Sequence, residues 1–149
     1  MLKPIALTFE AGGDPSVAAS MLDILKTSKV TSTIFLYGSW ANINPDLVKR
    51  MSTEGHELGN HTYNHVNLIK LDKSAIREEL RRTDEVARQL TGKPAHPWLR
   101  PPYSAIDERV KAIVKTDGYR IVCRDAIDGR NWPGEADPNT VFERTLQNA

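Results

Sequence analysis

The sequence has almost no cysteine, no excess of charge of either sign and no long apolar run. Cys123 is the only cysteine among 149 residues, which excludes an intrachain disulfide, and its largely apolar neighbours predict a small buried side chain. The 20 basic and 19 acidic residues leave a net charge of +1, so no field of one sign attracts nucleic acid or anionic lipid. Every apolar run falls short of the roughly 20 residues that a membrane-spanning helix needs. We therefore expect neither a nucleic-acid partner nor a membrane span.

Seven charged residues gather in one stretch with a helical pattern. Basic and acidic side chains alternate there, which is typical of a solvated helix face and predicts a structural role. These residues are Arg77, Glu78, Glu79, Arg81, Arg82, Asp84 and Glu85.

Short strand-like runs alternate with amphipathic helices along the whole chain, which suits a single domain over residues 1–149. Strands are predicted at residues 4–9, 31–36, 56–60, 98–100 and 119–123. Helices are predicted from Asp14-Pro15, from Asn44-Pro45, over residues 73–91 and 106–116, and from Asp137-Pro138. Such alternation implies parallel strands joined by right-handed crossovers, in an open doubly wound sheet or a barrel. Gly12-Gly13 matches neither the dinucleotide fingerprint nor the P-loop, which argues against a nucleotide-binding open sheet.

The spacing of apolar residues predicts which helix faces are buried. In the first helix the inward face is expected to carry Val17, Met21, Ile24 and Leu25. In the helix at residues 73–91 the inward residues are expected to be Ile76, Leu80, Thr83, Ala87 and Leu90.

Unusual polar segments follow the predicted strands. They are residues 10–13, 61–65, 100–103 and 125–132. Because functional loops lie at the carboxyl ends of parallel strands, these segments are expected to meet in one site.

Two histidines four residues apart stand out in the second of these segments. His61 and His65 lie in Gly-Asn-His-Thr-Tyr-Asn-His, and this spacing lets both imidazoles converge on one metal ion. The same pair on a solvated face would bind nothing, so the spacing alone leaves both interpretations open.

Four motifs taken together resemble the polysaccharide deacetylases, the NodB-homology carbohydrate esterases. They are Thr-Phe-Glu-Ala-Gly at residues 8–12, His-Thr-Tyr-Asn-His at 61–65, Arg-Pro-Pro-Tyr at 100–103 and Asp-Gly-Arg-Asn-Trp at 128–132. The resemblance covers nearly the whole chain and implies a distorted (β/α) barrel of parallel strands with outer helices. It also implies a divalent metal ion, zinc or cobalt, and hydrolysis of acetyl groups on chitin-type sugars, peptidoglycan or xylan.

The resemblance assigns a role to each matching residue. His61 and His65 would be metal ligands, and Glu10 would be the general base that takes a proton from the attacking water. Arg100 would orient that carboxylate, and Tyr103 would offer its backbone N–H to the developing oxyanion while its ring contacts substrate. Trp132 would stack on a sugar in the substrate groove, or else pack as a core aromatic.

The chain departs from the family pattern at three places. Ala11 stands where a carboxylate ligand is usual, so Glu10, Asp14 or solvent would have to complete the metal shell. Asn131 replaces an aspartate before Trp132. The last family motif, a strand whose histidine acts as general acid, is absent, so we expect a barrel that lacks its C-terminal strand through truncation or loss.

The sequence therefore predicts a metal-dependent deacetylase of acetylated glycans, with zinc or a similar ion as cofactor. The alternative is a catalytically impaired, carbohydrate-binding relative with the same fold, which Ala11 and Asn131 favour. An amidohydrolase for a small cyclic amide is a third possibility, which the histidine pair argues against. Although no signal peptide is visible, the resemblance implies work at the cell envelope or outside the cell.

Overall fold

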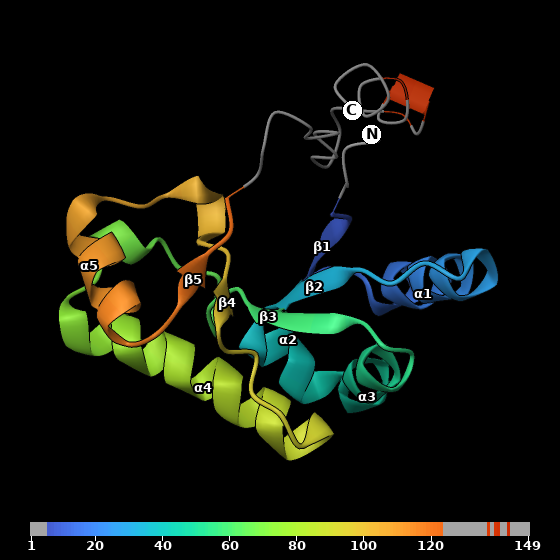
Figure 1. Cartoon of the computed structure of the whole chain (residues 1–149), viewed down its shortest axis with the longest axis horizontal. Coiled ribbons are helices and arrows are strands. Elements are labelled where there is room, and N and C mark those ends of the chain that lie inside the picture. The colour runs from blue at the N-terminus through green and yellow to red at the C-terminus, as the bar shows by residue number, and fades with distance from the viewer. Residues whose placement is uncertain (1–5, 124–136, 138, 141–142, 144–149) are drawn as a thin grey trace, which may run out of the picture.

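Five parallel strands form one sheet in the computed structural model, which describes residues 6–123, 137, 139–140 and 143 (Figure 1). The strands are β1 (Thr8–Ala11), β2 (Thr33–Leu36), β3 (Glu57–Asn60), β4 (Trp98–Leu99) and β5 (Arg120–Ile121). They lie in chain order, and each pairs with the next in parallel. In a doubly wound sheet the strand order reverses at one point. Here it does not reverse, so the strands wind in one direction, as they do in a barrel.

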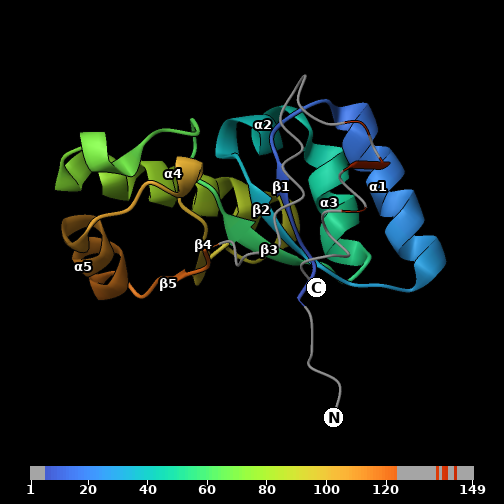
Figure 2. The same ribbon diagram turned by 90° about the horizontal axis from the view of Figure 1, so that it is seen from above.

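Helices connect consecutive strands and cover the outside of the sheet. They are α1 (Pro15–Ser28), α2 (Gly38–Ile43), α3 (Pro45–Thr53), α4 (Lys73–Thr91) and α5 (Glu108–Thr116), with short 3₁₀ turns η1 (Leu68–Lys70) and η2 (Pro102–Ser104). Figures 1 and 2 show α1 and α3 at the end of the sheet near β1 and β2, and α5 at the other end beside β5. No helix in the described part of the chain is long and apolar enough to cross a bilayer.

Local signals in the sequence set the helix boundaries. The side chains of Asp14, Asp72 and Asp107 each accept a hydrogen bond from a backbone N–H in the first turn of α1, α4 and α5. Gly92 ends α4 with a φ of 81°, a left-handed conformation that glycine adopts without steric cost. The predicted helix at residues 73–91 is thereby confirmed at both ends. The short helix α2 was not predicted; the Trp40 indole within it donates to the Gly13 carbonyl oxygen at 2.7 Å.

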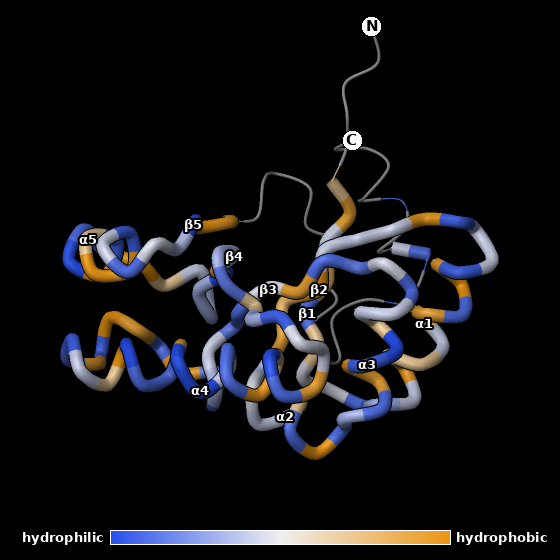
Figure 3. Tube along the Cα trace, turned by 60° about the horizontal axis from the view of Figure 1, so that its bottom comes forward, coloured by the Kyte–Doolittle hydropathy of each residue, from blue (hydrophilic) through white to orange (hydrophobic). Residues whose placement is uncertain are grey.

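Two clusters of apolar side chains form the core. One lies among α1, α2, α3 and the first three strands and includes Val86 of α4. The other lies among α4, α5, η1 and β4. The predicted inward stripe of α4 is confirmed for Ile76, Leu80, Thr83 and Ala87, which are buried, while Leu90 is half-buried. In Figure 3, blue and orange alternate along α4, as expected for a helix with one buried face.

The predicted inward face of α1 was wrong at two positions. Val17 and Ile24 are 65% and 66% exposed, whereas Leu22 and Leu25 are buried. The helix packs against the core through Ala18, Leu22 and Leu25, which lie on one face. Val17 and Ile24 therefore lie on the outer side. Leu22 was overlooked because Val17, Met21, Ile24 and Leu25 also satisfy helical spacing.

The prediction of a buried Cys123 was also wrong, since its side chain is exposed. Strand β5 ends at Ile121, two residues before the cysteine. Cys123 therefore lies beyond the part of the strand that packs on the core.

Candidate active site at the carboxyl ends of the strands

The last residues of all five strands form one row across the sheet. Ala11 pairs with Leu36, Leu36 with Asn60, Asn60 with Leu99, and Leu99 with Ile121. The residue just after each of β2 to β5 donates its backbone N–H to the carbonyl oxygen of the last residue of the preceding strand. Tyr37 donates to Ala11, His61 to Leu36, Arg100 to Asn60 and Val122 to Leu99, at 2.8 to 3.0 Å. This register brings three of the predicted functional segments to one edge, as expected for parallel strands; residues 125–132 lie outside the described residues.

His61 is held in one orientation by the adjacent strand. Its side chain is 1% exposed, and its Nδ1 lies 2.6 Å from the backbone carbonyl oxygen of Arg100. A carbonyl oxygen only accepts, so Nδ1 carries the proton and Nε2 carries the lone pair of the neutral ring. Nε2 lies 3.6 Å from Oε2 of Glu10. This is the tautomer that a metal-ligating imidazole needs, with its other nitrogen fixed by a backbone carbonyl.

His65 returns to the same place at the far end of the loop. Its ring centroid lies 5.1 Å from that of His61. The ring stacks on Tyr37, with centroids 4.3 Å apart and planes 12° from parallel, and meets Tyr103 at 4.6 Å. Burial lowers the pKa of His65, and the charge of Glu10 opposes that shift only in part. The neutral imidazole, which can bind a metal, is therefore favoured.

Glu10 and Arg100 face each other across the site. Arg100 Nη1 lies 3.7 Å from Glu10 Oε1, and Nη2 donates to the Thr8 hydroxyl at 2.8 Å. The Arg100 guanidinium also lies 4.3 Å above the Phe35 ring, which fills the space over Gly59, where a Cβ would meet the ring at 2.5 Å. Arg100 is thus a buried cation with fixed neighbours, while the Glu10 side chain remains 34% exposed.

Tyr103 lies in the turn η2 at the mouth of the site. It has a φ of 59°, which is uncommon for a residue other than glycine, and it is 58% exposed. Its ring is therefore available to a ligand beside His65. Of the predicted site residues, Glu10, His61, His65, Arg100 and Tyr103 come together, and Trp132 lies outside the described residues.

Two further residues of the site were missed in the sequence. Tyr37 stacks on His65, and burial together with the charge of Glu10 raises the pKa of its phenol to about 12. Glu79 is buried and accepts hydrogen bonds from the histidine loop, which corrects its placement on a solvated helix face. Both residues could have been found from their positions in the sequence. Tyr37 directly follows a predicted strand, where functional loops begin, and Glu79 lies three residues after the inward Ile76, on the same side of the helix.

The residues present match a divalent cation in donor type but are few in number. Two imidazoles beside a carboxylate are donors of the type that zinc and similar ions prefer. Among the described residues, however, no group of three or more His, Cys, Asp or Glu side chains is gathered closely enough to hold a metal. Asp14, considered as a further ligand, instead caps α1 through the Ser16 N–H at 2.8 Å. The candidate metal donors among the described residues are thus His61 and His65, with Glu10 beside them.

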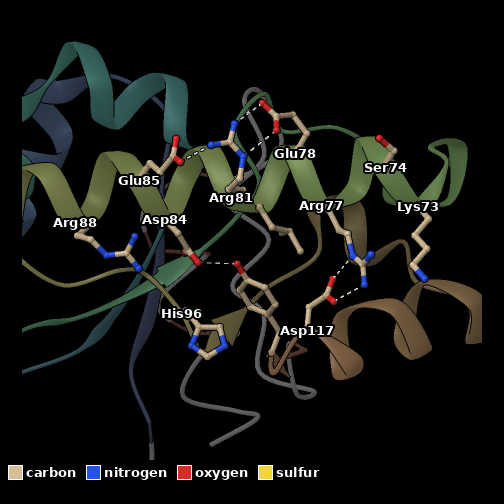
Figure 4. Close-up of a pocket in the computed structure, with 12 residues that line it drawn as sticks. Lys73, Ser74, Arg77, Glu78, Arg81, Asp84, Glu85, Arg88, His96 and Asp117 are labelled. Atoms are coloured by element: carbon tan, nitrogen blue, oxygen red, sulfur yellow. Dashed lines mark hydrogen bonds and ion pairs between the residues drawn. The ribbon is translucent and has the colours of Figure 1, made fainter.

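A hollow lies along α4, where the helix faces His96, Asp117 and Tyr119, and neither His61 nor His65 lines it (Figure 4). Its charged residues largely neutralise one another: Arg77 pairs with Asp117, and Arg81 with Glu78 and Glu85. None of the five clustered site residues lines it. We therefore place the candidate active site at the strand ends and not in this hollow.

A parallel α/β domain with imidazoles, a carboxylate and an arginine at its strand ends belongs to the class whose site is built from strand-end loops. The sequence model of the polysaccharide deacetylase family matches residues 2–122, and the chain belongs to this family. It is 36% identical over 145 residues to a peptidoglycan-N-acetylglucosamine deacetylase of Bacillus cereus, covering 97% of this chain and 52% of that protein. It is 38% identical over 120 residues to a peptidoglycan-N-acetylmuramic acid deacetylase of Bacillus subtilis, covering 80% and 46%. The chain thus spans about half the length of these relatives.

Solved structures agree with the fold and include relatives named as a deacetylase and as pseudoenzymes. A peptidoglycan N-acetylglucosamine deacetylase superposes with a TM-score of 0.90 at 35% identity, covering 97% of this chain and 66% of that one. A pseudoenzyme of carbohydrate esterase family 4 from Bacillus anthracis superposes at 0.88 with 25% identity, covering 97% and 50%. A mutant of a pseudoenzyme of this family, described as having restored enzymatic activity, superposes at 0.87 with 27% identity, covering 97% and 52%. The predicted α/β fold of parallel strands with outer helices is therefore confirmed.

Proposed function

We propose that this chain is a metal-dependent deacetylase domain that removes acetyl groups from N-acetylated sugars of the peptidoglycan type. The observation that carries the proposal is the grouping of His61, His65 and Glu10, with imidazole centroids 5.1 Å apart and the carboxylate 3.6 Å from His61 Nε2. Relatives that act on peptidoglycan support the substrate class. Chitin-type sugars, which are also N-acetylated, and O-acetylated xylan are the other substrates to be tested.

Each side chain has a chemical task in this reaction. His61 and His65 would hold a divalent ion, with zinc proposed first, and the bound ion would polarise the acetyl carbonyl and acidify a water molecule. Glu10, whose Oε2 lies 3.6 Å from His61 Nε2, would accept a proton from the attacking water, and its partial exposure leaves access to solvent. Arg100, whose Nη1 lies 3.7 Å from Glu10 Oε1, would orient the Glu10 carboxylate. Tyr103 presents its backbone N–H to the oxyanion and its exposed ring to the sugar.

Acetate release tests this proposal directly. Purified protein, stripped of metal and reloaded with Zn²⁺ or Co²⁺, is incubated with acetylated peptidoglycan fragments, chitooligosaccharides or acetylxylan. We expect release from the N-acetylated substrates, loss of release with chelator, and loss in His61→Ala. Glu10→Gln is the matched variant, because it should bind the metal and release no acetate. Metal-loaded protein that releases no acetate from any of the three would contradict the proposal.

A second candidate function is glycan binding without turnover. It is favoured by Ala11, which is buried in the row of strand ends where a carboxylate ligand is expected, and by the pseudoenzyme relative. In that case glycan affinity would survive both chelator and Glu10→Gln, and acetate release would stay at background. For either function we propose a location at the cell envelope, where peptidoglycan lies; fractionation of the source cells checks this.

A further inference from the structure

The loop that carries both histidines has a conformation that its own sequence does not favour. Thr62 and His65 have φ values of 65° and 54°, in the left-handed region that residues other than glycine rarely adopt. Thr62 is β-branched, for which this region is especially unfavourable. Such backbone persists only where surrounding contacts impose it. The geometry of the histidine pair therefore depends on residues outside the loop.

Glu79 of helix α4 supplies those contacts at the centre of the loop. Its Oε2 accepts hydrogen bonds from the backbone N–H groups of Tyr63 and Asn64, at 2.9 and 2.8 Å. Its Oε1 accepts a third bond, from the Asn64 side-chain amide, at 2.7 Å. Tyr63 and Asn64 lie midway between His61 and His65, so all three bonds act on the segment that sets the distance between the imidazoles.

Glu79 is committed to the loop rather than to an ion pair. The carboxylate is buried, and none of the described Lys and Arg side chains forms an ion pair with it, whereas its neighbour Glu78 is exposed and pairs with Arg81. A buried carboxylate accepting bonds from three neutral N–H donors forms charge-assisted hydrogen bonds, which are stronger than neutral ones. An ordinary charged residue of a solvated helix face makes no such set of contacts.

The same helix also anchors the start of the loop. Asn60, fully buried, donates to the Leu80 carbonyl oxygen at 2.9 Å and to Asp84 at 3.1 Å, and it accepts from the Thr62 N–H at 2.9 Å. Asp84 is in turn fixed by the Tyr119 hydroxyl at 2.7 Å, a bond drawn in Figure 4. The remainder of the loop is held from two sides. The backbone N–H groups of Gly38 and Ser39 donate to the Thr62 and Tyr63 carbonyl oxygens at 3.0 and 2.9 Å, and Glu79 accepts from the N–H groups of Tyr63 and Asn64.

We propose that Glu79 is a positioning residue, which sets the conformation of the loop so that His61 and His65 face a single metal ion. The proposal rests on the metal-binding function proposed above, but the ordering of the loop can be measured without metal. The hydrogen bonds of Glu79 run to Tyr63 and Asn64, so it acts through the residues between the two imidazoles. Its effect on metal binding is therefore expected to be indirect.

The test compares Glu79→Ala and Glu79→Gln with Glu78→Gln, an exposed neighbour on the same helix, and with Leu22→Ala, a core variant remote from the loop. Amide hydrogen exchange of Tyr63 and Asn64 is measured by NMR in metal-free protein, and affinity is measured for Co²⁺ alone. We expect Glu79→Ala to expose both amides and to weaken Co²⁺ binding by about 10- to 100-fold, as losses of outer-shell partners do. Glu79→Gln keeps an acceptor oxygen and should lose less, while Glu78→Gln should match the wild type.

Stability is monitored in parallel, because a purely structural glutamate would also destabilise the fold. Leu22→Ala should lower stability without changing Co²⁺ affinity or the exchange of the two amides. The proposal is overturned if Glu79→Ala keeps both amides protected, or if it exposes them while Co²⁺ affinity stays at the wild-type value. If Glu79→Ala does not fold, Glu79→Gln and Asn64→Ala decide by the same two measurements. If the wild type binds no Co²⁺, the proposed function fails, and amide exchange alone still decides whether Glu79 orders the loop.

Discussion

His61 Nδ1 donates a hydrogen bond of 2.6 Å to the backbone carbonyl oxygen of Arg100, while the Arg100 side chain reaches past it to Thr8 and Glu10. Arg100 thus acts on the site in two separable ways. Its backbone fixes the tautomer of a proposed metal ligand, and its guanidinium orients the proposed base. Substitution of the side chain removes the second effect and leaves the first in place.

Arg100→Lys is therefore expected to lower acetate release about 10- to 100-fold, in the range typical of lost outer-shell partners. An ammonium group cannot reproduce the planar fork that reaches the Thr8 hydroxyl through Nη2 and Glu10 through Nη1. Affinity for Zn²⁺ should stay close to the wild-type value, because the carbonyl contact to His61 is retained. Thr8→Val, which removes one bond to the guanidinium, serves as the milder control. A folded Arg100→Lys protein that no longer binds metal would refute this division of roles.

Ala11→Asp is expected to strengthen metal binding. Ala11 is 5% exposed and is the last residue of β1, in the row of strand ends that also contains Asn60, the residue before His61. The family resemblance implies a carboxylate ligand at the position of Ala11. A third protein ligand should tighten Zn²⁺ binding by a factor on the order of ten or more, about 1.4 kcal/mol. In metal-free protein the same buried charge should lower the melting temperature, and Zn²⁺ should restore it. Calorimetry and thermal unfolding with and without Zn²⁺ measure both effects.

The matched control for this substitution is Ala11→Asn, which has nearly the same size and no charge. If aspartate and asparagine change Zn²⁺ affinity equally, the side chain at position 11 does not face the metal. If Ala11→Asp also raises acetate release, the substitution parallels the pseudoenzyme mutant described as having restored activity.

The predictable parts of this structure are those set by short-range signals. Helix α4 begins after Asp72 and ends at Gly92 because a capping carboxylate and a left-handed glycine act within one turn. The meeting of Glu10, His61 and Arg100 also follows from the sequence, since parallel strands bring their carboxyl ends to one edge.

The residues that were misjudged depend on tertiary contacts. Glu79 has the charged neighbours Glu78 and Arg81, so its composition indicates a solvated face, and only the arrival of the histidine loop gives its carboxylate buried partners. Tyr37 gained its role by stacking on a residue 28 positions further along the chain, His65. Periodicity alone could not choose between these environments because it records position on a helix or strand and not what packs against it.

Helix α1 provides a test of the corrected packing. Leu22→Ala should destabilise the protein by about 2 to 5 kcal/mol, because the side chain is fully buried in the core cluster. Ile24→Ala removes a side chain that is 66% exposed, and its cost should lie within about 0.5 kcal/mol. Urea unfolding of the two variants gives both values. A larger cost for Ile24→Ala than for Leu22→Ala would mean that α1 packs through the face first predicted from the sequence.

Stability should fall as the pH is lowered below about 6.5, the ordinary pKa of histidine, through the buried His56. Its Nδ1 accepts a hydrogen bond from the Ser32 N–H at 3.2 Å, so a proton added there would face a donor. Burial, the main cause, lowers the pKa of His56 in the folded protein, and the nearby Arg50 adds to the shift while Glu54 opposes it. Below pH 6.5 the unfolded chain therefore binds more protons than the folded one, and each pH unit costs at most about 1.4 kcal/mol.

His56→Gln isolates this contribution because its amide oxygen can still accept from Ser32 but does not titrate. The free energy of unfolding is measured by urea denaturation between pH 7.5 and 5.5, because ordinary carboxylates titrate below this range. The wild-type curve should fall more steeply than that of His56→Gln, and the two should run parallel above about pH 7. Other groups contribute equally to both curves, so their difference reports His56. Curves that stay parallel down to pH 5.5 would show that His56 keeps its ordinary pKa in the folded protein.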